Sequence, residues 1–157
     1  MYRTFFGIAQ LLWNIHNRSI KSADIIKDIL GYYLRTPNET RWNAISDAMD
    51  DLQKHKAKLN TVMDTLGERR FTADEFIFLD EYNEVTKPLA ITLDILQGDS
   101  ASLGIVLPSL VKLKRHFNNI IQDGKMKFCL PLAKFMLWDL NERTSELFED
   151  KDYLLGD

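Results

Sequence analysis

The chain has 157 residues, a formal net charge of −3, 45% hydrophobic side chains and 27% charged side chains. A globular chain of this length buries roughly 70% of the surface that its unfolded form exposes, and this composition excludes a disordered protein. The net acidity also excludes a uniformly basic nucleic-acid binder, so any contact with DNA requires a local basic face.

The N-terminal segment predicts an intracellular protein. Its short apolar run is interrupted by Gln10, and no small-residue cleavage pattern follows, which argues against a secretory signal. No apolar run in the chain reaches the roughly 18 residues that a membrane span requires, so no membrane partner is expected. The single cysteine, Cys129, excludes an internal disulfide framework and fits a reducing compartment.

Two helices are predicted before residue 31. The first has one apolar face between residues 5 and 15, formed by Phe5, Ile8, Leu11, Leu12 and Ile15. The second is expected to start after Ser22 as N-cap, to carry Ile25, Ile26, Ile29 and Leu30, and to end at Gly31. Residues 32–38 then read as a connection, because Pro37 forces the residue before it out of helical geometry.

The third predicted helix is the longest regular pattern in the first half of the chain. Its stripe alternates spacings of three and four, is broken only by Lys56, and comprises Trp42, Ile45, Met49, Leu52, Leu59, Met63 and Leu66. Gly67 is expected to end this helix. Between the apolar positions lie Asp47, Asp50, Asp51, Lys54 and Lys58, which we interpret as a solvated face.

Three further helices are expected. The fourth begins with Thr72 and Glu75 at the spacing of a capping box, and Pro88 inside its stripe predicts a kink. The fifth carries apolar residues from position 103 to 121, and the sixth carries them from Met126 to Phe148. Since no segment alternates with period two, we predict an all-α fold: one domain over 1–157 with about six helices in a bundle-like array and no sheet.

No catalytic residue, metal site, cofactor or small-molecule substrate is predicted. The three histidines lie far apart in sequence and form no metal-ligand pair, and no glycine-rich phosphate loop is present. Cys129 lies in an apolar segment and is interpreted as a small buried hydrophobic residue rather than a nucleophile. The carboxylates of residues 47–51 and 80–84 resemble metal-binding clusters only in composition, and Asp47, Asp50 and Asp51 are interpreted as a solvated helix face.

Basic residues gather on the fifth predicted helix. Lys112, Lys114, Arg115 and His116 are adjacent there, Lys125 and Lys127 follow, and Arg69 with Arg70 forms a second small cluster. Such residues can contact DNA phosphates with weak, salt-sensitive affinity. The alternative is that they only solvate a helix face.

Three blocks of the sequence are distinctive: TRWNAISDAMDDL at Thr40–Leu52, the segment Leu79–Phe117 with KPLA and LDILQG, and Leu130–Asp150. In their order and spacing, these blocks resemble hAT-superfamily transposases and their domesticated relatives with BED-type zinc fingers. The resemblance implies the all-helical insertion domain of a ribonuclease-H-like core. It places the catalytic Asp, Asp and Glu outside this chain, which lacks the zinc finger and the complete core, so no enzymatic activity is expected.

The resemblance also implies a role for Arg41 and Trp42. In the family this dipeptide lies near the cleaved transposon end, where the tryptophan stacks on a displaced base and the arginine meets a phosphate, as aromatic residues hold unpaired bases elsewhere. It further implies a nuclear location. The alternative interpretation is that Trp42 is the first core residue of the helical stripe that ends at Leu66.

Three hypotheses remain open from the sequence. The first is a non-catalytic, transposase-derived domain, a fragment or a domesticated remnant, whose DNA-contact candidates are Arg41, Trp42, Lys112, Lys114 and Arg115. The second is a helical interaction module that binds a protein partner or its own copies, and the third is a chain with no selected activity. A face once covered by the catalytic core is expected to be exposed, with Phe5, Phe6 and Trp13 of the first helix as part of it.

Overall fold

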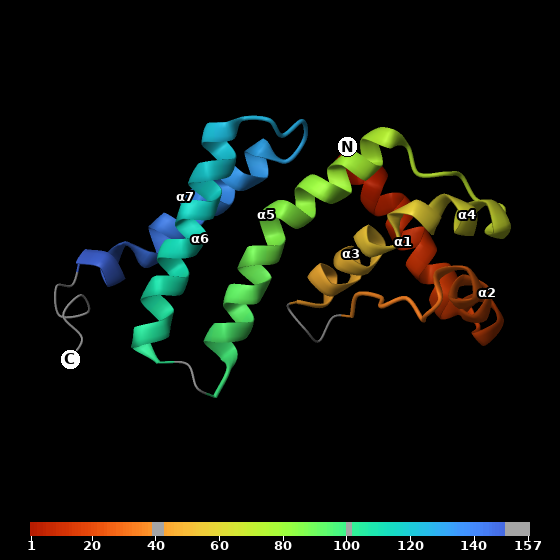
Figure 1. Ribbon diagram of the computed structural model, residues 1–157, viewed down its shortest axis with the longest axis horizontal. Helices are drawn as coiled ribbons and strands as arrows, with labels where there is room; N and C mark the ends of the chain where they lie inside the picture. Colours follow the sequence, from red (N-terminus) through yellow and green to blue (C-terminus); the bar gives the residue numbers. More distant parts are fainter. Residues whose placement is uncertain (39–42, 100–101, 150–157) are drawn as a thin grey trace. The chain divides into compact units, whose positions relative to one another are not determined.

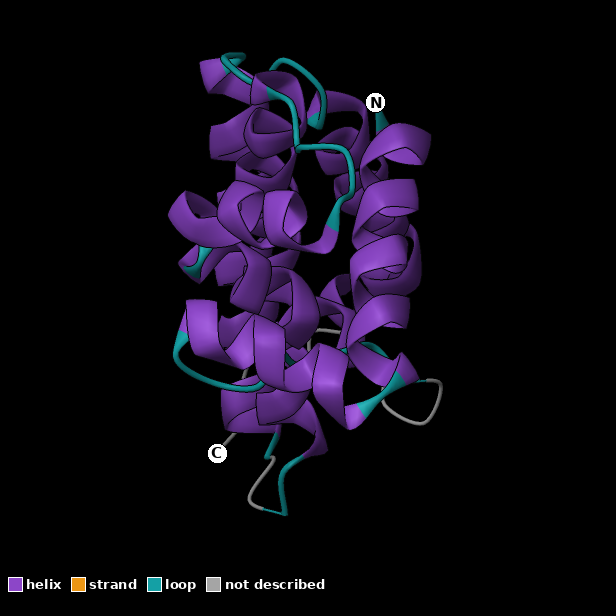
Figure 2. Ribbon diagram, turned by 90° about the vertical axis from the view of Figure 1, so that its right-hand side faces the viewer, coloured by secondary structure: helices purple, strands orange, loops and turns teal. Residues whose placement is uncertain are grey.

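The computed structural model describes residues 1–38, 43–99 and 102–149 and confirms an all-α fold (Figure 1). Within these ranges there are seven helices and no strand. Figure 2, coloured by secondary structure, shows the described residues as helices and loops. The helices are α1 Tyr2–Arg18, α2 Ile20–Leu30, α3 Ala44–Lys54, α4 Lys56–Leu66, α5 Ala73–Gln97, α6 Leu103–Asp123 and α7 Leu130–Glu149.

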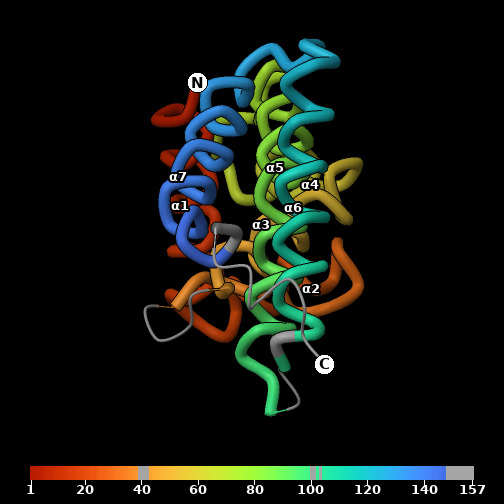
Figure 3. The backbone as a smooth tube through the Cα atoms, turned by 90° about the vertical axis from the view of Figure 1, so that its left-hand side faces the viewer, coloured from red at the N-terminus to blue at the C-terminus, as the bar shows by residue number. Residues whose placement is uncertain are grey.

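The chain divides into two compact units, Met1–Asn83 and Glu84–Asp157, and the boundary falls inside α5. In the first unit α1 packs against α2, and α2 against α4. In the second unit α6 packs against α7 (Figure 3). The interpretation of residues 1–157 as one helical domain stays a prediction.

The local signals for helix ends are largely confirmed. Gly31 and Gly67 have φ values of 92° and 71° and end α2 and α4, in the left-handed region that side chains with a Cβ rarely adopt. The predicted N-cap Ser22 is wrong: Ser19 caps α2, and its Oγ accepts a hydrogen bond from the Ser22 amide at 3.1 Å. Serine is a favoured N-cap residue, so the sequence alone does not distinguish Ser19 from Ser22 as the cap.

The capping box at the start of α5 is confirmed. The Glu75 amide donates to Thr72 Oγ1 at 3.2 Å, and the Thr72 amide donates to Glu75 Oε2 at 2.9 Å. Farther along, α5 continues through Pro88 as one helix to Gln97.

Two predicted helix boundaries are wrong. The expected third helix is two helices, because His55 leaves helical geometry with φ −106° and ψ 14°. Its side chain packs against Tyr32, with ring centroids 4.5 Å apart. Leu52 before the break and Leu59 after it are both fully buried. The apolar spacing therefore continues across His55, and the sequence pattern gives no sign of the break. The last helix starts at Leu130 rather than at Met126. This start places Pro131 in the first turn, where the missing amide hydrogen of proline is tolerated.

The aromatic side chains of α1 lie in the core of the first unit. Phe5 is 0% exposed and Trp13 is 1% exposed, while Phe6 is half-buried. Phe5 meets the rings of Phe71 and Phe78, with centroids 6.0 and 5.2 Å away. The prediction that this helix presents an exposed aromatic face is therefore wrong for Phe5 and Trp13, because residues distant in sequence cover them.

Arg35, in the segment after α2, pairs with a buried carboxylate of α3. Asp51, predicted to be solvated, is 2% exposed and accepts hydrogen bonds from the Arg35 amide at 2.9 Å and from its guanidinium at 2.9 and 2.7 Å. Burial disfavours the charged carboxylate, but these hydrogen bonds outweigh it and lower the pKa of Asp51. The burial of the Tyr32 hydroxyl beside this carboxylate raises the pKa of Tyr32 well above its ordinary value.

Removing the Asp51 carboxylate should destabilise the first unit. Asp51→Ala leaves the Arg35 amide without its acceptor and removes the shortest contacts of the Arg35 guanidinium, so it should lower the free energy of unfolding by about 2–3 kcal/mol. Asp47→Ala removes the same charge from a side chain that is 53% exposed and 3.5 Å from Arg35, and it should cost about 0.5 kcal/mol or less. Urea unfolding followed by circular dichroism measures both; equal costs would contradict the assignment of Asp51 as the buried anchor.

The buried carboxylates of Asp51 and Glu75 should make the stability of the fold sensitive to acid. The pKa of Asp51 is lowered, and so is that of Glu75: burial opposes its charge, but hydrogen bonds from Arg69 and Thr72 prevail. A lowered folded-state pKa contributes stability that is complete above the unfolded value and is lost as the pH falls through the folded one. The free energy of unfolding should therefore decline below about pH 4, and Asp51→Asn should flatten this decline. Identical profiles for the two proteins would refute the linkage.

Candidate functional site

The structure places three of the five predicted DNA-contact residues on one helix. Lys112, Lys114 and Arg115 lie on α6, whose one acidic residue, Asp123, is its last. Arg41 and Trp42 lie outside the described residues.

The core of the second unit determines which of these cations are exposed. On α6 the side chains that recur at helical spacing and are buried are Leu110, Leu113, Phe117 and Ile120. Lys112 and Arg115 fall between these positions and are exposed, and neither forms an ion pair or hydrogen bond with any other described residue. Lys114 is half-buried, and desolvation lowers its pKa. Lys112 and Arg115 are therefore the cations of α6 that are available to an anionic ligand.

The second basic cluster is already neutralised. Arg69 donates to both carboxylate oxygens of Glu75 at 2.8 and 2.9 Å, and Arg70 donates to both oxygens of Asp64 at 2.8 and 2.6 Å. These bidentate pairs raise the pKa of each arginine, chiefly through its hydrogen bonds to the carboxylate. A phosphate would have to displace those carboxylates, so this cluster is a poor candidate for a DNA contact.

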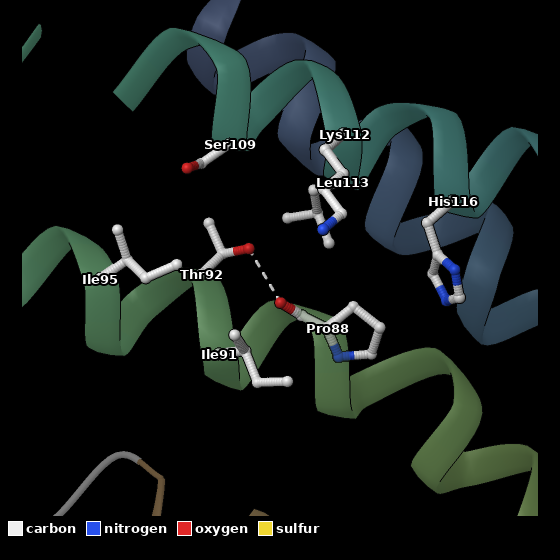
Figure 4. Close-up of a pocket in the computed structure, with 8 residues that line it drawn as sticks. All are labelled: Pro88, Ile91, Thr92, Ile95, Ser109, Lys112, Leu113 and His116. Atoms are coloured by element: carbon white, nitrogen blue, oxygen red, sulfur yellow. Dashed lines mark hydrogen bonds between the residues drawn. The ribbon is translucent and has the colours of Figure 1, made fainter. Parts of the chain in front are cut away.

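A groove lies between the C-terminal half of α5 and the middle of α6, both within the second unit (Figure 4). Its volume is about 320 Å³. Each helix contributes four lining residues: Pro88, Ile91, Thr92 and Ile95 from α5, and Ser109, Lys112, Leu113 and His116 from α6.

His116 compensates for a hydrogen bond that Pro88 removes from α5. Proline has no amide hydrogen, so the carbonyl four residues earlier, that of Glu84, loses its helical donor. His116 Nε2 lies 2.8 Å from this carbonyl oxygen. A carbonyl only accepts, so Nε2 must carry the proton. The histidine thereby ties α6 to α5 beside the groove.

The remaining polar groups of the groove are two hydroxyls and one amine. Thr92 Oγ1 donates to the Pro88 carbonyl at 2.8 Å, as the dashed line in Figure 4 marks, and Ser109 Oγ donates to the Ile105 carbonyl at 2.7 Å. Both hydroxyl protons are therefore directed to their own helices. No carboxylate lines the groove, and Lys112 supplies its ammonium group. The groove thus combines apolar walls with one cation and contains no nucleophile paired with a base.

The described residues also bear on three other features: a metal site, a reactive thiol and a membrane-spanning helix. These residues contain no group of three or more His, Cys, Asp or Glu side chains that could hold a metal ion. Cys129 is 2% exposed, as expected for a small hydrophobic residue in a core. Among the helices in this part of the chain, none has the length and apolar character needed to cross a membrane.

Sequence reasoning found the cations of α6 but missed the groove. One part of the arrangement could have been found from Pro88, because a proline inside a helix leaves the carbonyl four residues earlier without its amide donor. Nothing in the sequence pairs that carbonyl with His116, since the partner depends on how α6 packs against α5.

Comparison of the chain with protein-family models, with curated proteins and with solved structures gives no match.

The compensation by His116 can be tested with a double-mutant cycle. His116→Phe leaves the Glu84 carbonyl without a protein donor and should cost about 1 kcal/mol of folding free energy when Pro88 is present. Pro88→Ala restores the amide hydrogen, so His116→Phe should cost clearly less in that background. Chemical denaturation of the four proteins gives the coupling energy, and a coupling of zero would mean that the histidine does not replace the missing donor.

Proposed function

We propose that the chain is a non-catalytic helical module that binds DNA through α6 and derives from the insertion domain of a hAT-type transposase. The observation that carries the DNA-binding part is the exposure of Lys112 and Arg115 without a carboxylate partner among the described residues. The origin is supported by the resemblance of three sequence blocks, including the segment around Arg41 and Trp42.

The pairing of other cations in the chain supports the choice of α6. Ion pairs with aspartate or glutamate are formed in the first unit by Arg35, Lys54, Lys56, Arg69 and Arg70, and in the second unit by Lys125 and Arg143. An anion gains little from a cation that already has a carboxylate partner. On α6 a phosphate would meet two cations that need to exchange only water and counterions, which is the source of non-specific DNA affinity.

The proposed binding is electrostatic and independent of base sequence. Two phosphate contacts on a chain with a net charge of −3 give weak, strongly salt-dependent affinity. Arg41 and Trp42 would add contacts to a phosphate and to an unpaired base, and a nuclear location would follow from this role.

A protein-interaction module is the second candidate, favoured by one observation on α7. Phe135 and Trp138 are 56% and 58% exposed, with ring centroids 6.0 Å apart. Exposed aromatic pairs of this kind are common at protein interfaces.

In a fluorescence-anisotropy assay with DNA, Phe135→Ala combined with Trp138→Ala should leave affinity unchanged if α6 is the DNA-binding element.

The DNA proposal predicts a specific salt dependence. In fluorescence-anisotropy titrations with a duplex, Lys112→Gln combined with Arg115→Gln should reduce the slope of log affinity against log salt by about 1.8, because each lost phosphate contact removes about 0.9. The matched control is Lys21→Gln combined with Lys58→Gln, which removes the same charge from exposed lysines of the first unit. Equal slopes for the two double variants would show only a net-charge effect, and no binding at low salt would refute the proposal.

A further inference from the structure

We propose that the groove between α5 and α6 binds a small amphipathic carboxylate, with the acid group on Lys112 and the hydrocarbon part against the apolar walls. The ligand proposal does not rest on DNA binding, although the two proposed sites share Lys112. The groove is concave and largely apolar with one charged group, the usual composition of a small-ligand site.

The walls of the groove select an apolar body. Four of its eight lining residues are apolar, namely Pro88, Ile91, Ile95 and Leu113 (Figure 4). Ile91 and Ile95 are 52% and 42% exposed. Large aliphatic side chains exposed in a concavity gain when a hydrocarbon chain removes water from them. A purely polar anion would leave this surface hydrated.

The polar groups of the groove select an anion. The Lys112 ammonium forms no ion pair with another described residue, and no carboxylate lines the groove to neutralise it. The hydroxyl protons of Thr92 and Ser109 are used within their helices, and the Nε2 proton of His116 is used by Glu84. An ammonium ligand would face Lys112 as a like charge, whereas a carboxylate accepts a charge-assisted hydrogen bond from it.

The volume limits the size of the ligand. Ligand pockets span about 300–1,000 Å³, and this groove of about 320 Å³ lies at the lower end. It suits a single short hydrocarbon chain or one ring with an acid group. A dinucleotide or a two-chain lipid would extend far outside it.

The test compares two ligands with the same tail and opposite charge. Titrations of the ¹⁵N-labelled full chain with octanoate and with octylammonium should give saturable amide shifts for octanoate at residues 89–95 and 109–116. Octylammonium should bind at least tenfold more weakly. Equal binding of the two, or octanoate shifts confined to other residues, would overturn the proposal.

Three variants on α6 separate this site from DNA binding. Lys112→Met keeps the aliphatic stem but removes the charge, and it should weaken octanoate binding at least tenfold. Arg115→Met removes the same charge outside the groove and should leave octanoate binding unchanged while still lowering the DNA salt slope. Ser109→Leu fills the groove and should abolish octanoate binding without changing that slope.

The outcomes of these variants are distinguishable. Octanoate binding that survives both Lys112→Met and Ser109→Leu, in proteins with native-like spectra, would overturn the ligand proposal and leave the DNA proposal standing. A chain that binds octanoate at the groove but no DNA at low salt would refute only the DNA proposal.

Discussion

Two helices of the second unit are joined by a hydrogen bond that replaces one which α5 cannot make for itself. Pro88 lies in the interior of α5 and leaves the Glu84 carbonyl without its usual donor. The donor comes from α6, through His116. This contact fixes two helices at a point where apolar packing alone would permit sliding, because hydrogen bonds are directional and apolar contacts are not. The groove is lined by both of these helices, and Lys112 and His116 are among its lining residues.

The two units use charge in different ways. In the first, the carboxylates of Asp51 and Glu75 are buried and matched by Arg35 and Arg69, so charge is part of the internal structure. In the second, Lys112 and Arg115 of α6 lie outside the apolar stripe and face solvent. A small net charge for the whole chain therefore conceals a local positive surface, and this surface is the physical basis of both proposed binding activities.

The sequence predicted what is local and failed where partners are distant. Gly31 and the Thr72–Glu75 capping box were found because their signals lie within one turn of the helix end. Asp51 was misread because its partner lies 16 residues away, on a segment with no regular pattern. The cations of α6 followed from helical periodicity, but the groove needs side chains from two helices whose packing the sequence does not specify. The burial of Trp13 was missed for the same reason.

The hydrogen bond from His116 to the Glu84 carbonyl also makes positions 88 and 116 dependent on each other in evolution. Only the main chain of Glu84 takes part, so the identity of that residue is free to drift. Positions 88 and 116 are not independent: a proline at the first creates the need that the second fulfils. If alanine replaced Pro88, the amide would return to the helix and a donor at position 116 would no longer be required. A proline without a donor at position 116 would leave the carbonyl to water. These two positions are therefore expected to covary among related chains, as a signature of this helix pair that conservation at either position alone would not reveal.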